Sequence, residues 1–313
     1  MAQPLACWIV ALATMVGILG GSAGARAQDL EPRAYSASPI GTNFVLGSYL
    51  RTTGSASIDP SLPISGLEAT INTGVLAYDR TFPLFGHTAS AAILLPYVYG
   101  DLTGQIEQQS TGSTRSGHII RSGLGDLALR FTQNIVGDPA LTPEEFARRT
   151  PRTTFGTSFT IVAPTGDYDS AHLVNIGSNR WAFKPDIGIS LPLGRWFADA
   201  STGVWLFTDN DNFVRGHVRG EAPLWSIQGH VGYYFPRDIW LAADATYYNG
   251  GEISIDGVAK HNAQSVTRYG LTLSVPFGAG FSGKVAWSGW AGAHNGGTFD
   301  TLAFTLQYRW FDP

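Results

Sequence analysis

The residues that could carry out chemistry in this sequence are few, and their spacing matches no complete catalytic motif. His230 falls within a strand-like segment, and a hydrolase would need a serine beside it, such as Ser226 on the same strand. Ser201 and Ser254 are further candidates. A catalytic triad is defined by geometry rather than by order in the chain, so a hydrolase stays open as an alternative. The one match to G-x-S-x-G, Gly20–Gly24, lies in the apolar N-terminal segment and not between a strand and a helix, so we predict no catalytic residue.

Patterns that resemble cofactor or metal sites fall where turns and loops are expected. GAGFSG (Gly278–Gly283) fits G-x-G-x-x-G but lies between two alternating segments, whereas a dinucleotide site needs a helix after the motif. Five of the seven histidines lie in polar connections without the close spacing of metal ligands. DNDNF (Asp209–Phe213) lacks the glycine and the distal glutamate of an EF-hand loop. We therefore predict no metal ion and no cofactor.

The N-terminus has the features of a secretory signal peptide. An apolar run from Leu5 to Gly20 precedes the triplet Ala25-Arg26-Ala27, so we expect residues 1–27 to be removed before Gln28. A retained membrane anchor is the alternative. The one cysteine, Cys7, would leave with the signal peptide, which excludes a disulfide-stabilised secreted domain.

The composition is that of a chain in contact with lipid. Charged residues make up 14% of the sequence, against about 25% in soluble proteins. Beyond the signal peptide, no segment has the roughly 18 consecutive apolar residues of a membrane helix. The net charge of −4, without a lysine or arginine cluster, excludes nucleic acid as a partner. Low charge without long apolar runs is typical of a membrane β-barrel.

Segments of about ten residues alternate between apolar and polar positions, as in strands whose two faces meet different surroundings. In Ile239–Tyr248, the residues Ile239, Leu241, Ala243, Ala245 and Tyr247 would share one face. The expected strands are Phe44–Arg51, Thr70–Arg80, Thr88–Tyr99, Gly125–Ile135, Thr153–Val162, Trp181–Leu191, Phe197–Thr208, Trp225–Phe235, Ile239–Tyr248, Val266–Pro276, Phe281–Trp290 and Phe299–Trp310. We predict an all-β fold, a transmembrane antiparallel up-and-down β-barrel of about twelve strands, with ten to fourteen acceptable.

The connections between these segments are alternately short and long. Turn-like connections such as PLGRW and PRD follow even-numbered strands, whereas long polar ones such as Thr52–Gly66 and Asp101–Ser122 follow odd-numbered strands. The connection after the fourth strand is longer, and TPEEFARR within it predicts a short helix with Thr142 as N-cap and Pro143 at its first position. Short periplasmic turns and long external loops are typical of outer-membrane barrels, and they disfavour a soluble sandwich or propeller. We expect residues 28–40 to form a periplasmic lead and residues 41–313 to form one barrel domain.

If the apolar phase faces lipid, the opposite phase faces the lumen. The charged and aromatic residues expected to line the lumen are Asp126, Arg130, Lys184, Asp186, Asp199, Trp205, His230, Tyr234, Asp244, Tyr248, Arg268, Lys284, Trp290 and Arg309. Both signs of charge occur, which disfavours a strongly ion-selective pore. The charges would either pair and brace the wall or contact a solute, and the aromatic rings would either stack on a solute or fill space.

Three motifs follow one another between Ala163 and Gly194: P-T-G-D-Y, N-I-G-S-N and W-x-F-x-P. Together with the preceding segment GLGDLALRF (Gly123–Phe131), they resemble the bacterial outer-membrane transporter family of the meta-pathway of phenol degradation. The resemblance covers most of the mature chain. One departure is the C-terminus, where Asp312 and Pro313 follow the aromatic residue at which outer-membrane barrels commonly end.

The motif residues that we single out are Pro164, Gly166, Asp167, Asn175, Gly177, Asn179 and Trp181. Proline, glycine, aspartate and asparagine shape turns and cap backbone N–H groups, so we expect a structural role, with ligand contact as the alternative.

The resemblance implies an outer-membrane channel in a Gram-negative bacterium for passive uptake of small hydrophobic or aromatic compounds. Outer-membrane lipid, lipopolysaccharide and the barrel-assembly machinery are the other expected partners. The alternatives are a structural or adhesive surface barrel and the membrane-embedded hydrolase considered above.

Overall fold

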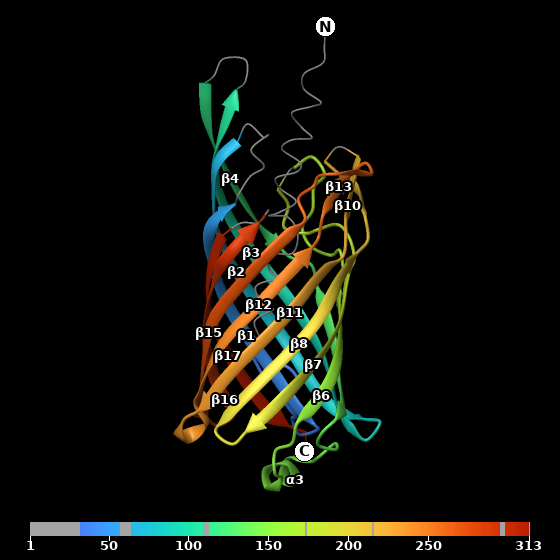
Figure 1. Cartoon of the computed structure of the whole chain (residues 1–313), viewed down its shortest axis with the longest axis vertical. Coiled ribbons are helices and arrows are strands. Elements are labelled where there is room, and N and C mark those ends of the chain that lie inside the picture. Colours follow the sequence, from blue (N-terminus) through green and yellow to red (C-terminus); the bar gives the residue numbers. More distant parts are fainter. Residues whose placement is uncertain are drawn as a thin grey trace.

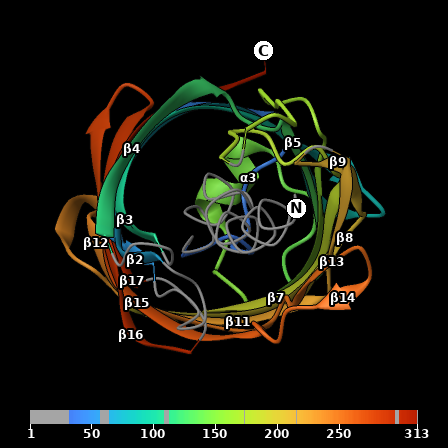
Figure 2. The ribbon, with the colours of Figure 1, turned by 90° about the horizontal axis from the view of Figure 1, so that it is seen from above.

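The structure is a computed structural model that describes residues 32–56, 64–108, 113–172, 174–214, 216–294 and 298–312. The expected signal peptide, residues 1–27, lies outside the described residues. The described part forms an upright barrel of tilted antiparallel strands (Figure 1). Seen along its axis, the strands form a ring (Figure 2). In this part of the chain, no helix is long and apolar enough to cross a membrane.

The barrel wall contains most of the strands. Their bounds are β1 Thr42–Ala56, β2 Ile64–Leu84, β3 His87–Gln108, β4 Ser113–Leu124, β5 Ala128–Val136, β6 Thr154–Val162, β7 Ala182–Leu193, β8 Trp196–Phe207, β11 Leu224–Tyr234, β12 Trp240–Gly250, β15 Gln264–Gly278, β16 Phe281–His294 and β17 Thr298–Phe311. β4 and β5 follow each other along the same edge of β3 and occupy one position in the wall. β1 pairs with both β2 and β17, so within the described residues a closed wall of 12 strands results. The predicted fold class is therefore confirmed.

The alternation in the sequence follows the two faces of the wall. In β12 the residues from Trp240 to Tyr248 are alternately buried and exposed, with Leu241 and Tyr247 on the exposed face. Along β17, Leu302, Phe304, Leu306, Tyr308 and Trp310 form an exposed stripe, as the sequence predicts. Apolar side chains thus cover the outside, where a membrane barrel meets lipid.

Tight turns join the wall strands at one end, which we call the short-turn end. Phe85 and Gly86 connect β2 to β3 with positive φ angles of 50° and 81°. The G-x-G-x-x-G pattern makes the turn between β15 and β16, where Gly280 has a φ of 84° and no helix follows. The glycines of this pattern therefore serve a turn, as expected.

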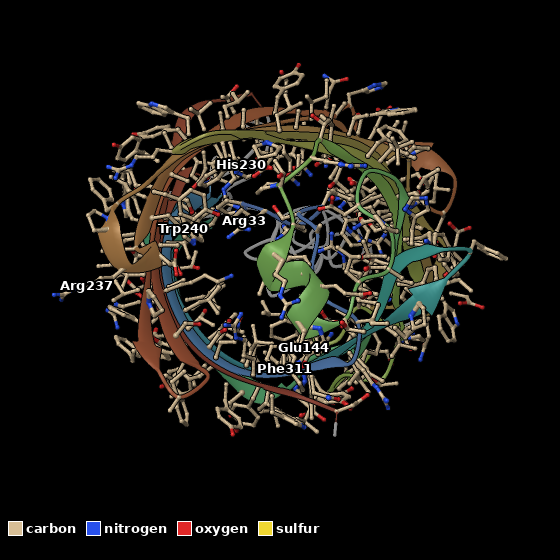
Figure 3. The ribbon with its side chains drawn as sticks, turned by 90° about the horizontal axis from the view of Figure 1, so that it is seen from below. Arg33, Glu144, His230, Arg237, Trp240 and Phe311 are labelled. Carbon is tan, nitrogen blue, oxygen red and sulfur yellow. The ribbon has the colours of Figure 1, made fainter. Side chains whose placement is uncertain are left out.

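The predicted short helix is present as α3, Pro143–Arg148. Thr142 Oγ1 accepts a hydrogen bond from the backbone N–H of Glu145 at 3.4 Å, and the Glu145 carboxylate accepts one from the N–H of Thr142 at 2.9 Å. These contacts form a capping box. The helix lies across the mouth of the barrel at the short-turn end (Figure 3).

The opposite end, the long-loop end, holds more regular structure than the sequence predicts. The described residues of the connections expected between 52 and 66 and between 101 and 122 belong to strands, because β1, β2 and β3 extend beyond their expected bounds and β4, which the sequence did not predict, pairs with β3. A small sheet of β9 Asn210–Phe213, β10 His217–Glu221, β13 Ile253–Ile255 and β14 Val258–Ala259 fills two other connections. One face of these extensions packs against Val174 through Ala69 and Leu102, but charged and polar residues interrupt the apolar alternation by which strands were recognised.

Candidate functional site

The residues predicted to line the lumen lie on the inward face of their strands or beside it. Lys184, Asp186, Asp199, Trp205, His230, Asp244, Tyr248 and Arg268 are buried, whereas Asp126, Arg130, Tyr234, Lys284 and Trp290 are partly buried and Arg309 is exposed. Figure 3 shows His230 within the ring of strands, whereas Arg237 projects outside it. The barrel interior thus combines charges of both signs with aromatic rings.

Several of these charges are held by neighbours on the wall. Lys184 Nζ lies 3.9 Å from the Asp186 carboxylate and 5.4 Å from the centre of the Trp205 ring. Arg268 donates to Ser288 Oγ at 2.7 Å and lies over the Trp290 ring. Of the two roles expected for the inward charges, these contacts are those of groups that pair and brace the wall.

His230 belongs to a three-residue network across adjacent strands. Its Nδ1 lies 2.7 Å from Asp244 Oδ1, and Thr272 Oγ1 donates to Asp244 Oδ2 at 2.7 Å. In the part of the chain that the structure describes, no serine hydroxyl is hydrogen-bonded to the His230 ring. Ser226 Oγ instead donates to the Gly203 carbonyl at 3.5 Å. The histidine–carboxylate half of a hydrolytic triad is present here, but no nucleophile is joined to it.

Asp126 binds the loop that carries the P-T-G-D-Y and N-I-G-S-N motifs (residues 164–181), which we call the family-motif loop. It lies in the break between β4 and β5, where its carboxylate accepts hydrogen bonds from the N–H groups of Gly166 and Ser178 at 2.9 and 2.8 Å. Ser178 Oγ donates to the same carboxylate at 2.6 Å. The loop therefore supplies hydrogen bonds in place of strand pairing at the break between β4 and β5.

The motif residues make contacts that shape this loop. Asp167 Oδ2 accepts from the N–H of Leu124 at 2.9 Å, and Asn175 bridges the backbone of Asp169 and His172. Gly166 and Gly177 approach so closely that a Cβ on either would lie 2.7–2.8 Å from the other's backbone. Trp181, by contrast, is exposed and stacks on Phe183 outside the barrel. Pro164 follows the end of β6, and Asn179 Nδ2 donates to Asn210 Oδ1 at 2.9 Å.

A buried ionic cluster supports the loops at the long-loop end. Arg180 and Arg219 both donate to Glu221, at 2.6 and 3.1 Å, and the three side chains are almost entirely buried. Tyr168 lies nearby and donates to the Asn212 carbonyl at 3.1 Å; burial raises the pKa of its hydroxyl. These contacts join the family-motif loop to the small sheet at the long-loop end of the barrel.

The sequence did not reveal that the described part of the N-terminal lead, which we call the lumen segment (residues 32–41), enters the barrel. The Arg33 N–H donates to Asp199 Oδ2 at 2.9 Å, and its guanidinium lies over the Tyr234 ring. Tyr35 is 3% exposed, and its hydroxyl is bonded to Ser158 and Asp186. Figure 3 shows Arg33 inside the ring of strands. The predicted lead thus reaches several of the residues expected to line the lumen.

Among the described residues, the lumen segment borders two cavities. A cavity of about 110 Å³ is lined by Tyr35, Arg130, Lys184, Asp199, Trp205 and His230, among others. A cavity of about 260 Å³ is lined by Arg33, Ser36, Phe44, Asp79 and Arg130, among others. Ala34 belongs to both linings, so the lumen segment lies between the two spaces.

Two glycines in the wall strands were the sequence feature that could have indicated the approach of the lumen segment. Gly156 and Gly188 are register partners on β6 and β7, at inward positions, and a Cβ on either would meet the Tyr35 ring. Glycine inside a strand often marks the close approach of another group. The sequence shows the two glycines but not the segment that approaches them.

A closed antiparallel barrel with an apolar outer face and a polar, partly filled interior defines the class of transmembrane β-barrels. A family model described as "Putative MetA-pathway of phenol degradation" matches residues 49–306. The chain therefore belongs to this family. No curated protein matches the sequence.

Among solved structures, the chain is similar in fold to an outer membrane channel from Pseudomonas putida F1. The two share 22% sequence identity with a TM-score of 0.74, over 90% of this chain and 100% of that one. The β domain of the Bordetella autotransporter BrkA has 14% identity and a TM-score of 0.48, over 87% of this chain and 100% of that one. The transport unit of the Escherichia coli autotransporter AIDA-I has 9% identity and a TM-score of 0.47, with both chains fully covered.

Proposed function

We propose that this chain is a channel of the Gram-negative outer membrane for the passive uptake of small hydrophobic or aromatic compounds. The observation that carries the proposal is the lumen, which contains cavities bounded by both polar groups and aromatic rings. The exposed apolar outer face suits a position in lipid. The family to which the chain belongs supports an aromatic solute.

The orientation follows from the general rule for these barrels. The short turns, the start of the first wall strand and the end of the last one lie in the periplasm. The longer loops face outward, next to lipopolysaccharide. The lumen segment would then enter from the periplasmic side. Before insertion, the chain would pass through the barrel-assembly machinery.

Within this channel, the cavity next to Trp205 is the proposed solute path. The buried indole N–H of Trp205 and Asp199 Oδ1 have no hydrogen-bond partner among the described residues. An unpaired buried donor and acceptor are costly, and a passing solute or water could satisfy them. Lys184, Asp186 and His230 would set the polarity of the path, while the aromatic ring offers a stacking surface.

Solute flux tests the channel. The full-length protein, reconstituted in planar bilayers or in liposomes for swelling assays, should conduct weakly, and Tyr35→Ala should increase flux several-fold because it removes the side chain that fixes the lumen segment. Tyr247→Ala, which removes an outward-facing tyrosine, is the matched control and should leave flux unchanged. The absence of flux from every variant would contradict the channel. Ester hydrolysis that disappears in His230→Ala would instead support the hydrolase.

A further inference from the structure

The Tyr35 side chain lies in a narrow slot of the inner wall, between β6 and β7. A Cβ at Gly156 would lie 2.9 Å from the Tyr35 ring, and one at Gly188 would lie 2.3 Å from it. Any other residue at these two positions would therefore close the slot. Because the glycines are register partners, the space that they leave runs across both strands.

Polar groups lie at the inner end of this slot. The Tyr35 hydroxyl donates to the Asp186 carboxylate and lies 3.0 Å from Ser158 Oγ. Asp186 and Ser158 are 6% and 4% exposed. The slot thus combines room for a flat ring with a buried carboxylate that can accept a hydrogen bond from a ring hydroxyl. A hydrogen bond to an ionised acceptor is stronger than one between neutral groups.

The group that fills the slot is itself a phenol, attached to the chain through its Cβ. The slot also borders the cavity of about 110 Å³, so a molecule in that cavity reaches the Tyr35 ring directly. On the basis of the proposed channel function, we infer that the slot is a binding site for phenolic solutes, and that Tyr35 occupies it as an internal competitor. A hydroxylated aromatic ring entering from the cavity would displace Tyr35 and with it residues 32–37 of the lumen segment.

The way in which the lumen segment is held suits such displacement. No residue from Pro32 to Ile40 belongs to a strand or helix, so its release breaks no sheet pairing. Besides the hydrogen bonds of Tyr35, the segment makes one from the Arg33 N–H to Asp199 and one between Ser36 Oγ and Ser190 Oγ, at 3.0 Å. These are single hydrogen bonds, which contribute modestly because water replaces them when they open. The backbone from Ser38 to Gly41 is bonded to Thr88, Thr81 and Leu141 and stays in place as the anchor of the displaced part.

Binding of fluorinated probes to the full-length protein in micelles tests the competition. 4-Fluorophenol and 4-fluorotoluene differ in the hydroxyl group, and fluorine NMR reports the binding of each. Tyr35→Ala should bind 4-fluorophenol about tenfold more tightly than the unmodified protein, since the internal competitor is gone. It should prefer 4-fluorophenol to 4-fluorotoluene, because only the former can donate a hydrogen bond to the Asp186 carboxylate. Equal affinity for both probes, or no gain over the unmodified protein, would overturn the inference.

Filling the slot provides the second test. In the Tyr35→Ala background, Gly188→Val places a side chain where the three nearest atoms had belonged to Tyr35, so the fold can accept it. This variant should lose 4-fluorophenol binding. Gly229→Val in the same background is the matched control, since Gly229 faces outward with nothing within 4 Å of its Cβ position, and it should keep binding. Retained binding in the Gly188 variant would refute the slot.

The same variants separate this inference from the channel proposal. If Tyr35→Ala conducts in bilayers but binds neither probe, the channel stands and the phenol site is wrong. If it binds 4-fluorophenol and Gly188→Val abolishes that binding, but no variant conducts, the site stands and the channel is wrong.

Discussion

Individual polar side chains fix the inner wall by bonding across strands rather than along them. Asp244 on β12 accepts hydrogen bonds from His230 on β11 and Thr272 on β15, and all three side chains are buried. In a low-dielectric interior, a carboxylate with two such partners holds both neighbours in one orientation. The network therefore ties three consecutive strands together beside the proposed solute path.

Removal of Asp244 should destabilise the barrel more than removal of the whole pair. We expect Asp244→Ala to lower the free energy of unfolding by about 3 kcal/mol, because it leaves buried partners of the carboxylate unsatisfied. His230→Leu combined with Asp244→Leu should recover more than half of this loss, since apolar groups replace the buried pair. Urea unfolding in lipid vesicles, followed by tryptophan fluorescence, measures both. A double variant as unstable as the sum of His230→Leu and Asp244→Leu, each measured alone, would show that the pair is not coupled.

At the scale of elements, the family-motif loop and the interrupted wall strand depend on each other. Asp167 bonds the N–H of Leu124, and its own N–H donates to the Leu124 carbonyl at 2.8 Å. This exchange is possible because Gly123 has no side chain: a Cβ there would lie 1.8 Å from Asp167 Oδ2. The end of β4 is thus completed by a loop from elsewhere in the chain.

Gly123→Ala should release the motif loop without opening the barrel. The added methyl group displaces the Asp167 carboxylate from Leu124, at a cost of about 1–3 kcal/mol for the backbone group left unpaired. Limited proteolysis should then cleave between residues 164 and 178 faster than in the unmodified protein. Gly74→Ala is the control, because its Cβ position is open, and it should leave cleavage unchanged. Equal protection in both variants would mean that Asp167 does not anchor the loop.

The elements that the sequence predicts best are those that cross the expected lipid zone. Every wall strand except β4 was found from its alternation, and Thr142 and Pro143 correctly marked the start of α3. The extensions of β2 and β3, and β4 itself, were missed because charged and polar residues interrupt their apolar alternation. The place of Tyr35 could not be predicted either, because its contacts with Ser158 and Asp186 join residues more than 120 positions apart.

Closure of the whole molecule depends on its two ends meeting. β1 pairs with β17 from Thr42 to Ser55, and beyond the last pair Asp312 continues the contact. The Asp312 carboxylate accepts hydrogen bonds from Asn43 at 2.8 Å and from Arg80 at 2.6 Å, so it joins β17 to β1 and β2 at the short-turn end. The residue that departs from the usual aromatic terminus thus has a structural role.

The contact of Asp312 should make this end of the closure dependent on pH. The hydrogen bond from Asn43, followed by that from Arg80, lowers the pKa of the carboxyl group below its ordinary value of 3.8. A lowered pKa means that the contact is complete above pH 3.8 and is lost as the pH falls through the lower value in the folded protein. Hydrogen exchange of the β1 and β17 amides near Thr42 and Phe311 should therefore accelerate only below pH 3.8. In Asp312→Asn exchange should be fast already at neutral pH and show no such step, whereas Asp211→Asn, at an exposed position of β9, should match the unmodified protein. An unchanged step in Asp312→Asn would assign the closure to strand pairing alone.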